Sequence, residues 1–204
     1  MKNLNILILI VLLNSCNHSG RVETKANFLH DIATFTPDSL VNVVIEIPAG
    51  TCLKTEYDKS KNEFSVERLQ DGTLRSVQFL PYPSNYGFIP STEMRMDLGG
   101  DGDALDVLVL AEALPKGQVL ETIPIALLKL KDNDELDYKI IAVPKEPKLQ
   151  IINCTSYACL QQNYSAIISI IELWFTHYKG SNKIVVVGWD TEESANQEIQ
   201  KWTR

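Results

Sequence analysis

The chain has 204 residues, of which 45% are hydrophobic and 22% are charged, a balance typical of globular proteins and unlike disordered or fibrous ones. This length allows one sizeable domain or at most two small ones. The formal net charge is −7, and no run of Lys or Arg is long enough to follow a nucleic-acid backbone. We therefore expect no nucleic-acid partner.

The N-terminus is a separate unit. After one lysine, an apolar run over residues 4–13 leads to the tetrapeptide LNSC, which ends at Cys16. About ten residues are too few to cross a bilayer as a helix, which needs roughly 20, but they suit a signal peptide. LNSC resembles the lipobox of bacterial lipoproteins. The alternative is a buried first helix that contains a chance cysteine.

These observations predict a signal peptide over residues 1–15, a lipidated Cys16 with a linker over residues 16–37, and one domain over residues 38–204. Lipidation would make the membrane a partner. It would place the protein in a bacterial cell envelope, in the periplasm or on the outer membrane. If the start is misassigned, a cytoplasmic location is expected instead.

Three further cysteines remain, at positions 52, 154 and 159. An odd number argues against a full disulfide framework. Cys154 and Cys159 could pair in an oxidising compartment, or all three could be unpaired small hydrophobes.

Beyond the linker, strand signals dominate the first two thirds of the chain. Short apolar or alternating runs are bounded by Pro, Gly, Asn or Asp and predict strands over residues 41–47, 63–69, 106–110, 122–130 and 137–143. Helical spacing appears late, over residues 165–179, before a strand over 183–189 and a final helix that begins near Asp190. Strands followed by helices favour an α+β domain on an antiparallel or barrel-like sheet.

The densest polar feature is GGDGDALDVLVL, which places Asp101, Asp103 and Asp106 directly before an apolar strand. Such a cluster is usually a solvated turn. An EF-hand calcium loop is a second interpretation, but Leu105 stands where that pattern wants Asp or Asn. A third is a site for hard divalent cations such as Mg²⁺ that leaves room for a phosphate. The local spacing leaves these interpretations open.

Other polar residues share this placement at strand ends. Asp132, Asp137 and Lys139 again lead into a strand, and Glu46 interrupts an apolar run, where an acid is costly unless it is paired, binds a cation or lies on an exposed face. Further candidates are Lys54, Glu56, Arg68, Tyr82, Tyr86, Tyr178 and Lys179.

With these segments in order, the chain resembles the soluble, Mg²⁺-dependent inorganic pyrophosphatases of type I. DGDALDV matches that family's signature except that Ala104 replaces the usual proline. VVIEIPAG, LKTEYD, YPSNYGFIP, LKLKDNDELDYKIIAVP, HYK and VVVGW also match, in the family's order. The resemblance implies a five-stranded barrel like the oligonucleotide-binding fold, with flanking C-terminal helices. It also implies a homo-oligomer, since bacterial relatives form hexamers.

The resemblance also implies roles for individual residues. The metal ligands would be Asp101, Asp103, Asp106, Asp132 and Asp137, supported by Glu46, and they would hold several Mg²⁺ ions, with Mn²⁺ or other divalent cations as substitutes. The substrate-binding residues would be Lys54, Arg68, Tyr82, Tyr86, Lys139, Tyr178 and Lys179. Glu56 matches a further polar position near the site.

The implied reaction is hydrolysis of pyrophosphate by a metal-activated water, with Asp103 as the catalytic base. The alternatives are hydrolysis of another phosphoanhydride and a non-catalytic binding module on the same fold.

Overall fold

The computed structural model describes residues 27–133, 135–180 and 183–204. The expected signal peptide, Cys16 and the first part of the expected linker lie outside these residues. Within the described ranges, no helix is both long enough and apolar enough to cross a membrane.

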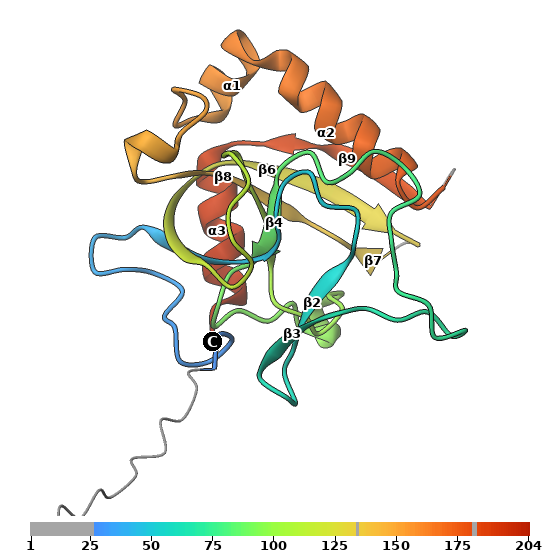
Figure 1. The fold of residues 1–204 in the computed structure, drawn as a ribbon. Helices are drawn as coiled ribbons and strands as arrows, with labels where there is room; N and C mark the ends of the chain where they lie inside the picture. Colours follow the sequence, from blue (N-terminus) through green and yellow to red (C-terminus); the bar gives the residue numbers. More distant parts are fainter. Residues whose placement is uncertain (1–26, 134, 181–182) are drawn as a thin grey trace, which may run out of the picture.

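Five strands form a closed ring (Figure 1). In ring order they are β1 (Val41–Ile47), β4 (Asn85–Phe88), β5 (Asp106–Val109), β8 (Lys139–Pro144) and β6 (Val119–Asp132). The long strand β6 closes the ring by pairing with both β8 and β1. All pairs are antiparallel except β5 with β8. Closure protects the strand edges, and the expected five-stranded barrel is confirmed.

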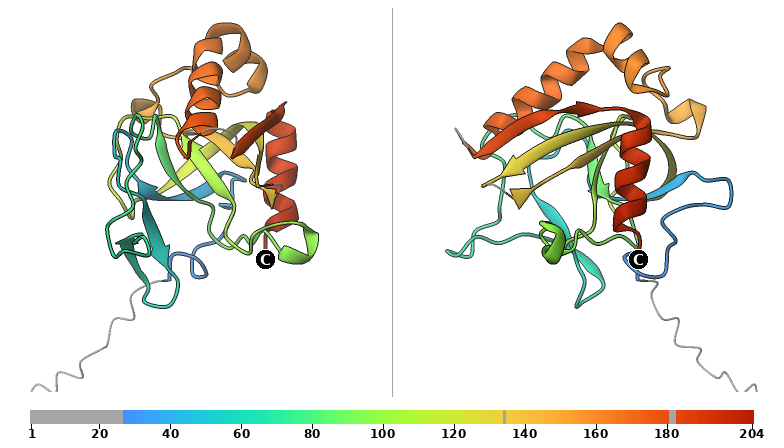
Figure 2. Two further views of the ribbon diagram at one scale, coloured as in Figure 1. Left: turned by 90° about the vertical axis from the view of Figure 1, so that its right-hand side faces the viewer. Right: turned by 180° about the vertical axis from the view of Figure 1, so that it is seen from behind.

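The barrel strands are buried on both faces, which explains why their sequences are continuous apolar runs. Along β8, Ile140 and Ala142 belong to one core cluster, and Ile141 and Val143 belong to another. The first cluster includes the buried face of helix α3 (Glu192–Trp202), and the second includes that of helix α2 (Ser165–His177). Two helices therefore cover different faces of one sheet (Figure 2).

The remaining elements extend or cap this barrel. Strand β9 (Ile184–Asp190) pairs with the second half of β6, and β7 (Glu135–Leu136) pairs with its end. Helix α1 (Tyr157–Asn163) precedes α2, and two short 3-10 turns, η1 (Met96–Leu98) and η2 (Pro147–Leu149), lie in connections. The final helix begins with Thr191 as its N-cap, whose hydroxyl accepts a hydrogen bond from the Ser194 N–H.

Strands β2 (Thr55–Asp58) and β3 (Glu63–Val66) form a separate two-stranded sheet beside the barrel. The predicted strand over residues 63–69 therefore ends early, at Val66. The Glu67 N–H still donates to the carbonyl of Lys54, the residue before β2, but the Glu67 carbonyl accepts from the Arg75 N–H. Beyond Glu67 the backbone therefore pairs with the segment that follows it, as the Arg68–Leu74 bridge also shows.

The predicted linker is too long, because its last eleven residues, 27–37, pack against the domain. The side chain of Leu29 is buried with 3% exposure, and Phe35 forms an isolated bridge with Val41. The apolar residues of this segment have neither helical nor strand spacing, so the sequence pattern did not separate them from a solvated tether. The domain therefore includes residues before position 38.

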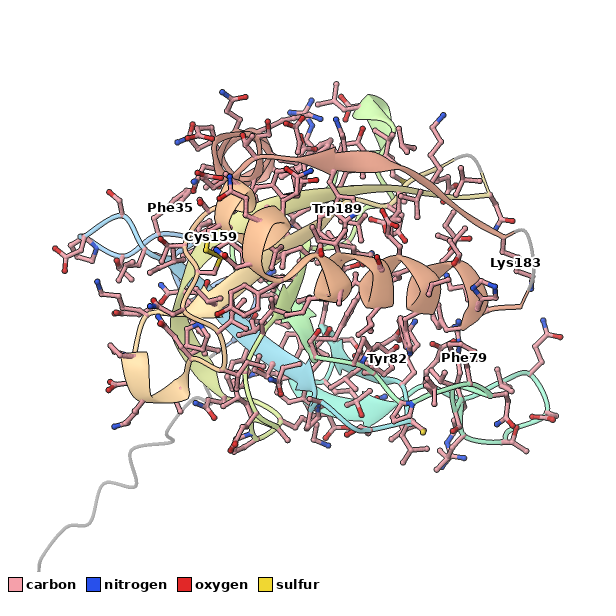
Figure 3. All side chains as sticks on the ribbon, turned by 90° about the horizontal axis from the view of Figure 1, so that it is seen from above. Phe35, Phe79, Tyr82, Cys159, Lys183 and Trp189 are labelled. Atoms are coloured by element: carbon pink, nitrogen blue, oxygen red, sulfur yellow. A yellow bond between two sulfur atoms is a disulfide. The ribbon has the colours of Figure 1, made fainter. Side chains whose placement is uncertain are left out.

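Cys154 and Cys159 form a disulfide next to the start of α1, with their Cα atoms 5.7 Å apart (Figure 3). This decides between the two states that the sequence left open for them. Cys52 is unpaired.

Candidate active site

One pocket of about 270 Å³ collects the polar residues singled out in the sequence. It forms where the beginnings of β5 and β8, the end of β6, the segment after α2 and strand β2 meet. All the expected metal ligands line it, as do all the expected substrate-binding residues except Arg68: Glu46, Lys54, Tyr82, Tyr86, Asp101, Asp103, Asp106, Asp132, Asp137, Lys139, Tyr178 and Lys179. Glu56 lines it as well.

The loop before β5 presents its aspartates through backbone constraints. Gly102 has φ of +83°, and a Cβ on Gly100 would lie 2.4 Å from the Met94 carbonyl oxygen, so glycine is required at both positions. The Asp103 N–H donates to Asp101 Oδ1 at 2.9 Å. Leu105, which is fully buried, anchors the far end of the loop. The loop thus holds Asp101 and Asp103 at the pocket wall.

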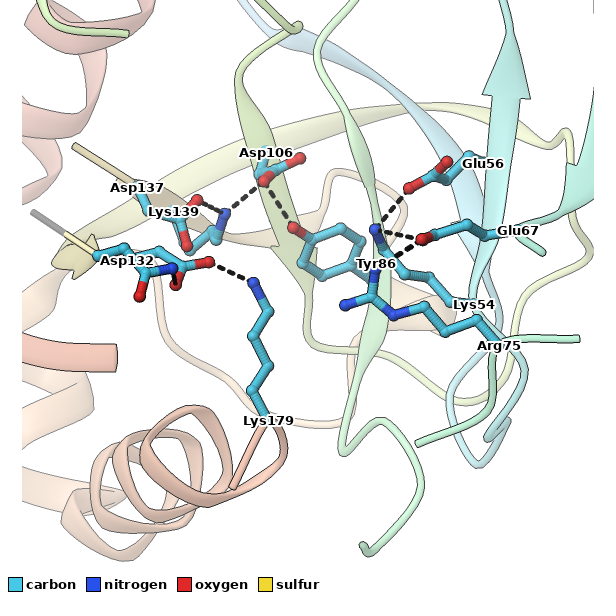
Figure 4. A network of polar contacts seen from close by, with 11 residues as sticks. Lys54, Glu56, Glu67, Arg75, Tyr86, Asp106, Asp132, Asp137, Lys139 and Lys179 are labelled. Carbon is cyan, nitrogen blue, oxygen red and sulfur yellow. Dashed lines mark hydrogen bonds and ion pairs between the residues drawn. The ribbon is translucent and has the colours of Figure 1, made fainter. Parts of the chain in front are cut away.

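A buried lysine joins two carboxylates at the centre of the pocket. Asp106 and Lys139 are register partners on the parallel strands β5 and β8, and Lys139 donates to both Asp106 and Asp137 (Figure 4). Burial alone would lower the pKa of Lys139, which is 2% exposed, but the negative charges of Asp106 and Asp137 raise it instead. This ammonium group is therefore charged at neutral pH.

Burial also raises the pKa of Asp106, and the Lys139 charge opposes that rise. The Tyr86 hydroxyl donates to Asp106 Oδ2 at 2.5 Å, and burial holds the pKa of this phenol well above its ordinary value. Tyr86 is consequently a hydrogen-bond donor at neutral pH, directed at the same carboxylate.

Asp132 at the end of β6 and Lys179 just after α2 form a second ion pair across the pocket (Figure 4). The adjacent Tyr178 stacks on Trp174 of α2, with ring centroids 4.3 Å apart. Burial raises the pKa of the Tyr178 phenol. Its ring therefore belongs to the core, while the residue still lines the pocket.

Glu46 has a carboxyl group whose pKa is strongly raised. Burial raises its pKa to about 8, from an ordinary value of 4.5. The Tyr57 N–H, 2.7 Å from Glu46 Oε1, lowers that pKa, whereas the charge of Asp106 raises it further.

A third group of charges lies beside β2. Glu67 bonds both Lys54, at 2.9 Å, and Arg75, whose Nη1 lies 2.7 and 2.8 Å from the two carboxylate oxygens (Figure 4). Arg75 also lies close enough to Tyr82 for its charge to lower the pKa of that phenol, and Tyr82 and Tyr178 in turn raise the pKa of Arg75. Arg75 therefore lies near two residues of the pocket, although it is not itself one of the residues that line it.

Arg68 does not share this position. Its Nη1 donates to the Gly72 carbonyl at 2.8 Å, within an exposed turn that follows β3. The family resemblance implied a substrate-binding role for Arg68, and that role stays a prediction. No local pattern marked Arg75, which the fold places next to Lys54 because the backbone beyond Glu67 folds back.

Lys59 was also missed. Its Nζ lies 2.8 Å from Asp103 Oδ1, and it lines the pocket. It follows β2 in a polar turn, and only the tertiary fold brings that turn to the acidic loop, so no local pattern marked it.

The donor set suits divalent cations that are held loosely by protein. Aspartate and glutamate oxygens are the ligands that Mg²⁺ prefers. Yet among the described residues no three acidic, histidine or cysteine side chains converge into a compact cluster. Lysines stand beside Asp103, Asp106, Asp132 and Asp137 instead. Such carboxylates fit ions that complete their coordination with water and phosphate oxygens.

Sequence comparison with known proteins identifies one family of relatives. The family model described as inorganic pyrophosphatase matches residues 43–204. An inorganic pyrophosphatase of Saccharolobus solfataricus is 38% identical over 172 residues, which cover 81% of this chain and 90% of that protein. One from Neisseria meningitidis is 34% identical over 173 residues, with the same coverage of both chains.

Solved structures agree on the fold. An inorganic pyrophosphatase from Neisseria gonorrhoeae superposes with a TM-score of 0.71 at 31% identity, covering 84% of this chain and 94% of that one. A type I inorganic pyrophosphatase from Toxoplasma gondii gives a TM-score of 0.77 at 26% identity, covering 86% and 85%. By sequence and by fold, this chain belongs to the inorganic pyrophosphatase family.

Proposed function

We propose that the pocket hydrolyses inorganic pyrophosphate to two phosphates with the help of several Mg²⁺ ions. One observation carries the proposal: five aspartates and the cations Lys54, Lys59, Lys139 and Lys179 line a single pocket of about 270 Å³. Pyrophosphate is small and highly charged, so bare carboxylates would repel it. Divalent cations between carboxylates and phosphate oxygens remove that conflict, and Mn²⁺ could replace Mg²⁺ with the same oxygen ligands.

Asp101, Asp103, Asp106, Asp132 and Asp137 would hold the ions, and Glu46 would support them. When bound, the ions supply two effects: they lower the pKa of the attacking water and neutralise charge on the phosphate oxygens.

Asp103 is the carboxylate best placed to accept the proton of the attacking water. Asp106 and Asp137 are both engaged by the buried Lys139. In contrast, the Asp103 side chain is 71% exposed, and that of its partner Lys59 is 47% exposed. Water can therefore reach the Asp103 carboxylate, and a mobile lysine can leave it.

The cations and phenols would bind the phosphate oxygens. Lys54 and Arg75 approach from the β2 side, and Lys139 and Lys179 approach from the opposite wall (Figure 4). The phenols of Tyr82, Tyr86 and Tyr178 keep their protons, because burial raises the pKa of each. Fixed donors of this kind stabilise charge that develops on the leaving phosphate.

A lipid anchor at Cys16 is also part of the proposal. The apolar run and lipobox resemblance of residues 1–16 support it, and the Cys154–Cys159 disulfide supports an oxidising compartment such as the periplasm. Residues 17–26 separate the anchor from Asn27, and a fully extended chain of that length reaches at most about 36 Å. The active site would stay close to the membrane.

A homo-oligomer completes the proposal. Exposed Ile170 and Leu173 on α2, and Val185 and Val187 on β9, supply apolar surface that a second copy would cover. Light scattering that gives the mass of one 22.9 kDa chain would contradict it.

The assay that tests the function is phosphate release from pyrophosphate by the full chain, with and without Mg²⁺. We expect release only with the cation. Release from ATP but not from pyrophosphate would indicate another phosphoanhydride substrate. No release from either would indicate a non-catalytic binding module.

We expect Asp103→Asn to lower kcat for pyrophosphate by about 10²–10⁴-fold at saturating Mg²⁺, since the amide cannot accept the proton. Asp97→Asn is the matched control: Asp97, in the 3-10 turn η1, is also exposed and paired with a basic residue, Arg95, but it does not line the pocket. Near-full turnover by Asp103→Asn would show that another group is the base.

We expect Arg75→Ala to lower the rate by about 10²–10³-fold, as loss of one fixed charge-stabilising group commonly does. Arg68→Ala should leave the rate within about twofold, because it removes only a turn contact. Steady-state kinetics of both variants decide between the two arginines. A large loss of rate in Arg68→Ala with little loss in Arg75→Ala would assign the stabilisation of phosphate charge to Arg68.

Palmitate labelling in a bacterial host tests the anchor. The native chain should incorporate label and sediment with membranes, and Cys16→Ala should do neither, because the acylated sulfur is lost. Equal labelling of Cys16→Ala and the native chain, or none in either, would contradict lipidation at this residue. Cys52→Ala controls for acylation at the other unpaired cysteine.

A further inference from the structure

The substrate-facing hairpin is attached to the barrel mainly through side chains. Strands β2 and β3 pair with each other and form no ladder with the barrel strands. Lys54 and Lys59 flank β2, so one proposed phosphate ligand and the partner of the proposed base both depend on this small sheet. A two-stranded sheet alone is at best marginally stable in water. Something else must therefore fix its position.

Four aromatic rings form part of that attachment. Tyr57 of β2 contacts Phe64 of β3 at 5.3 Å between ring centroids and stacks on Phe88 of β4 at 5.8 Å. Phe28 completes the group, 5.7 Å from Tyr57 and 5.3 Å from Phe64, both edge-on. Aromatic pairs in these geometries contribute about 0.5–1.5 kcal/mol beyond the area that they bury. Phe28 thus contacts both strands of the hairpin.

Phe28 and Leu29 belong to residues 27–36, which precede the part of the chain matched by the family model. The Phe28 N–H donates to the Tyr57 hydroxyl at 3.2 Å. Leu29 packs in the same cluster as Tyr57, Phe88 and Ala104, and it lines the pocket itself. Ala104 adjoins Asp103, so Leu29 contacts the hairpin side and the acidic-loop side of the pocket together.

The segment is itself fixed to the barrel. The Leu29 carbonyl accepts from the Ser91 N–H at 2.8 Å, and the Thr34 hydroxyl donates to the Pro90 carbonyl at 2.9 Å. The Ser91 hydroxyl returns a hydrogen bond to the Ile32 carbonyl at 2.8 Å. The segment is therefore bonded to the loop after β4 on one side and packs against the hairpin on the other.

We propose that Phe28 and Leu29 are positioning residues for the active site: they hold the β2–β3 hairpin against the acidic loop and so set the affinity for pyrophosphate. The effect on affinity for pyrophosphate rests on the proposed function. The attachment of the hairpin rests on the contacts above alone. The same contacts maintain Tyr57, whose N–H bonds Glu46.

The experiment compares Phe28→Ala and Leu29→Ala with Leu120→Ala, all in the full chain. Leu120 is also buried in the domain, at 8% exposure, but its cluster contains no pocket residue. We expect the KM for pyrophosphate to rise on the order of tenfold in the first two variants, with a smaller change in kcat, because misplaced ligands cost affinity. Leu120→Ala should lower the unfolding midpoint without raising KM.

A second readout is independent of activity. Hydrogen exchange at the amides of residues 55–66 should quicken in Phe28→Ala and Leu29→Ala but not in Leu120→Ala. Two milder variants, Phe28→Leu and Leu29→Met, keep most of the buried volume. Leu29→Met should have the KM of the native chain. Phe28→Leu should still quicken hydrogen exchange, because the ring contacts are gone.

Unchanged exchange over residues 55–66 in both alanine variants would overturn the proposal, and so would an unchanged KM in an active enzyme. An inactive native chain would contradict the proposed function alone, since the exchange measurement still decides whether Phe28 and Leu29 hold the hairpin. If an alanine variant fails to fold, Phe28→Leu carries the same comparison.

Discussion

Lys139 lies between Asp106 and Asp137, and the active site is organised around this contact. A buried ammonium group or a buried carboxylate alone would be costly. The parallel pairing of β5 and β8 places Asp106 opposite Lys139, so each neutralises part of the other's charge. Tyr86 adds a hydrogen bond to the same carboxylate. The barrel can therefore hold charged groups at the edge of its core.

The pocket as a whole has more acidic than basic side chains, because seven carboxyl groups line it together with four lysines. Burial, with a smaller contribution from the charge of Asp106, raises the pKa of Glu46 to about 8. A pocket with this many carboxyl groups that also carries Lys54, Lys139 and Lys179 suits a substrate that arrives with metal ions. The electrostatic arrangement and membership of the inorganic pyrophosphatase family lead to the same chemistry.

The walls of the pocket are attached to the domain in different ways. The barrel wall, with Asp106 and Lys139, is held by backbone ladders, and the α2 wall is held by stacking of Tyr178 on Trp174. The hairpin wall forms no ladder with the barrel and is held by side-chain packing, which includes the stack of Tyr57 on Phe88 and the segment before the family's matched region. If the N-terminus is anchored as proposed, the tether enters the domain beside this wall.

The sequence alone determined the strand-rich class, because short β-branched runs between turn residues favour strands over helices. Its ordered motifs also determined the acidic residues and most of the cations of the pocket. Local pattern could not show that Arg75 lies beside Lys54, since the backbone beyond Glu67 turns back and brings the two together. Nor could it reveal Lys59 or Leu29, whose partners lie far away in sequence and meet them only after the barrel closes. Residue type and spacing thus specified which chemistry is available, and tertiary packing decided which of the available groups reach the site.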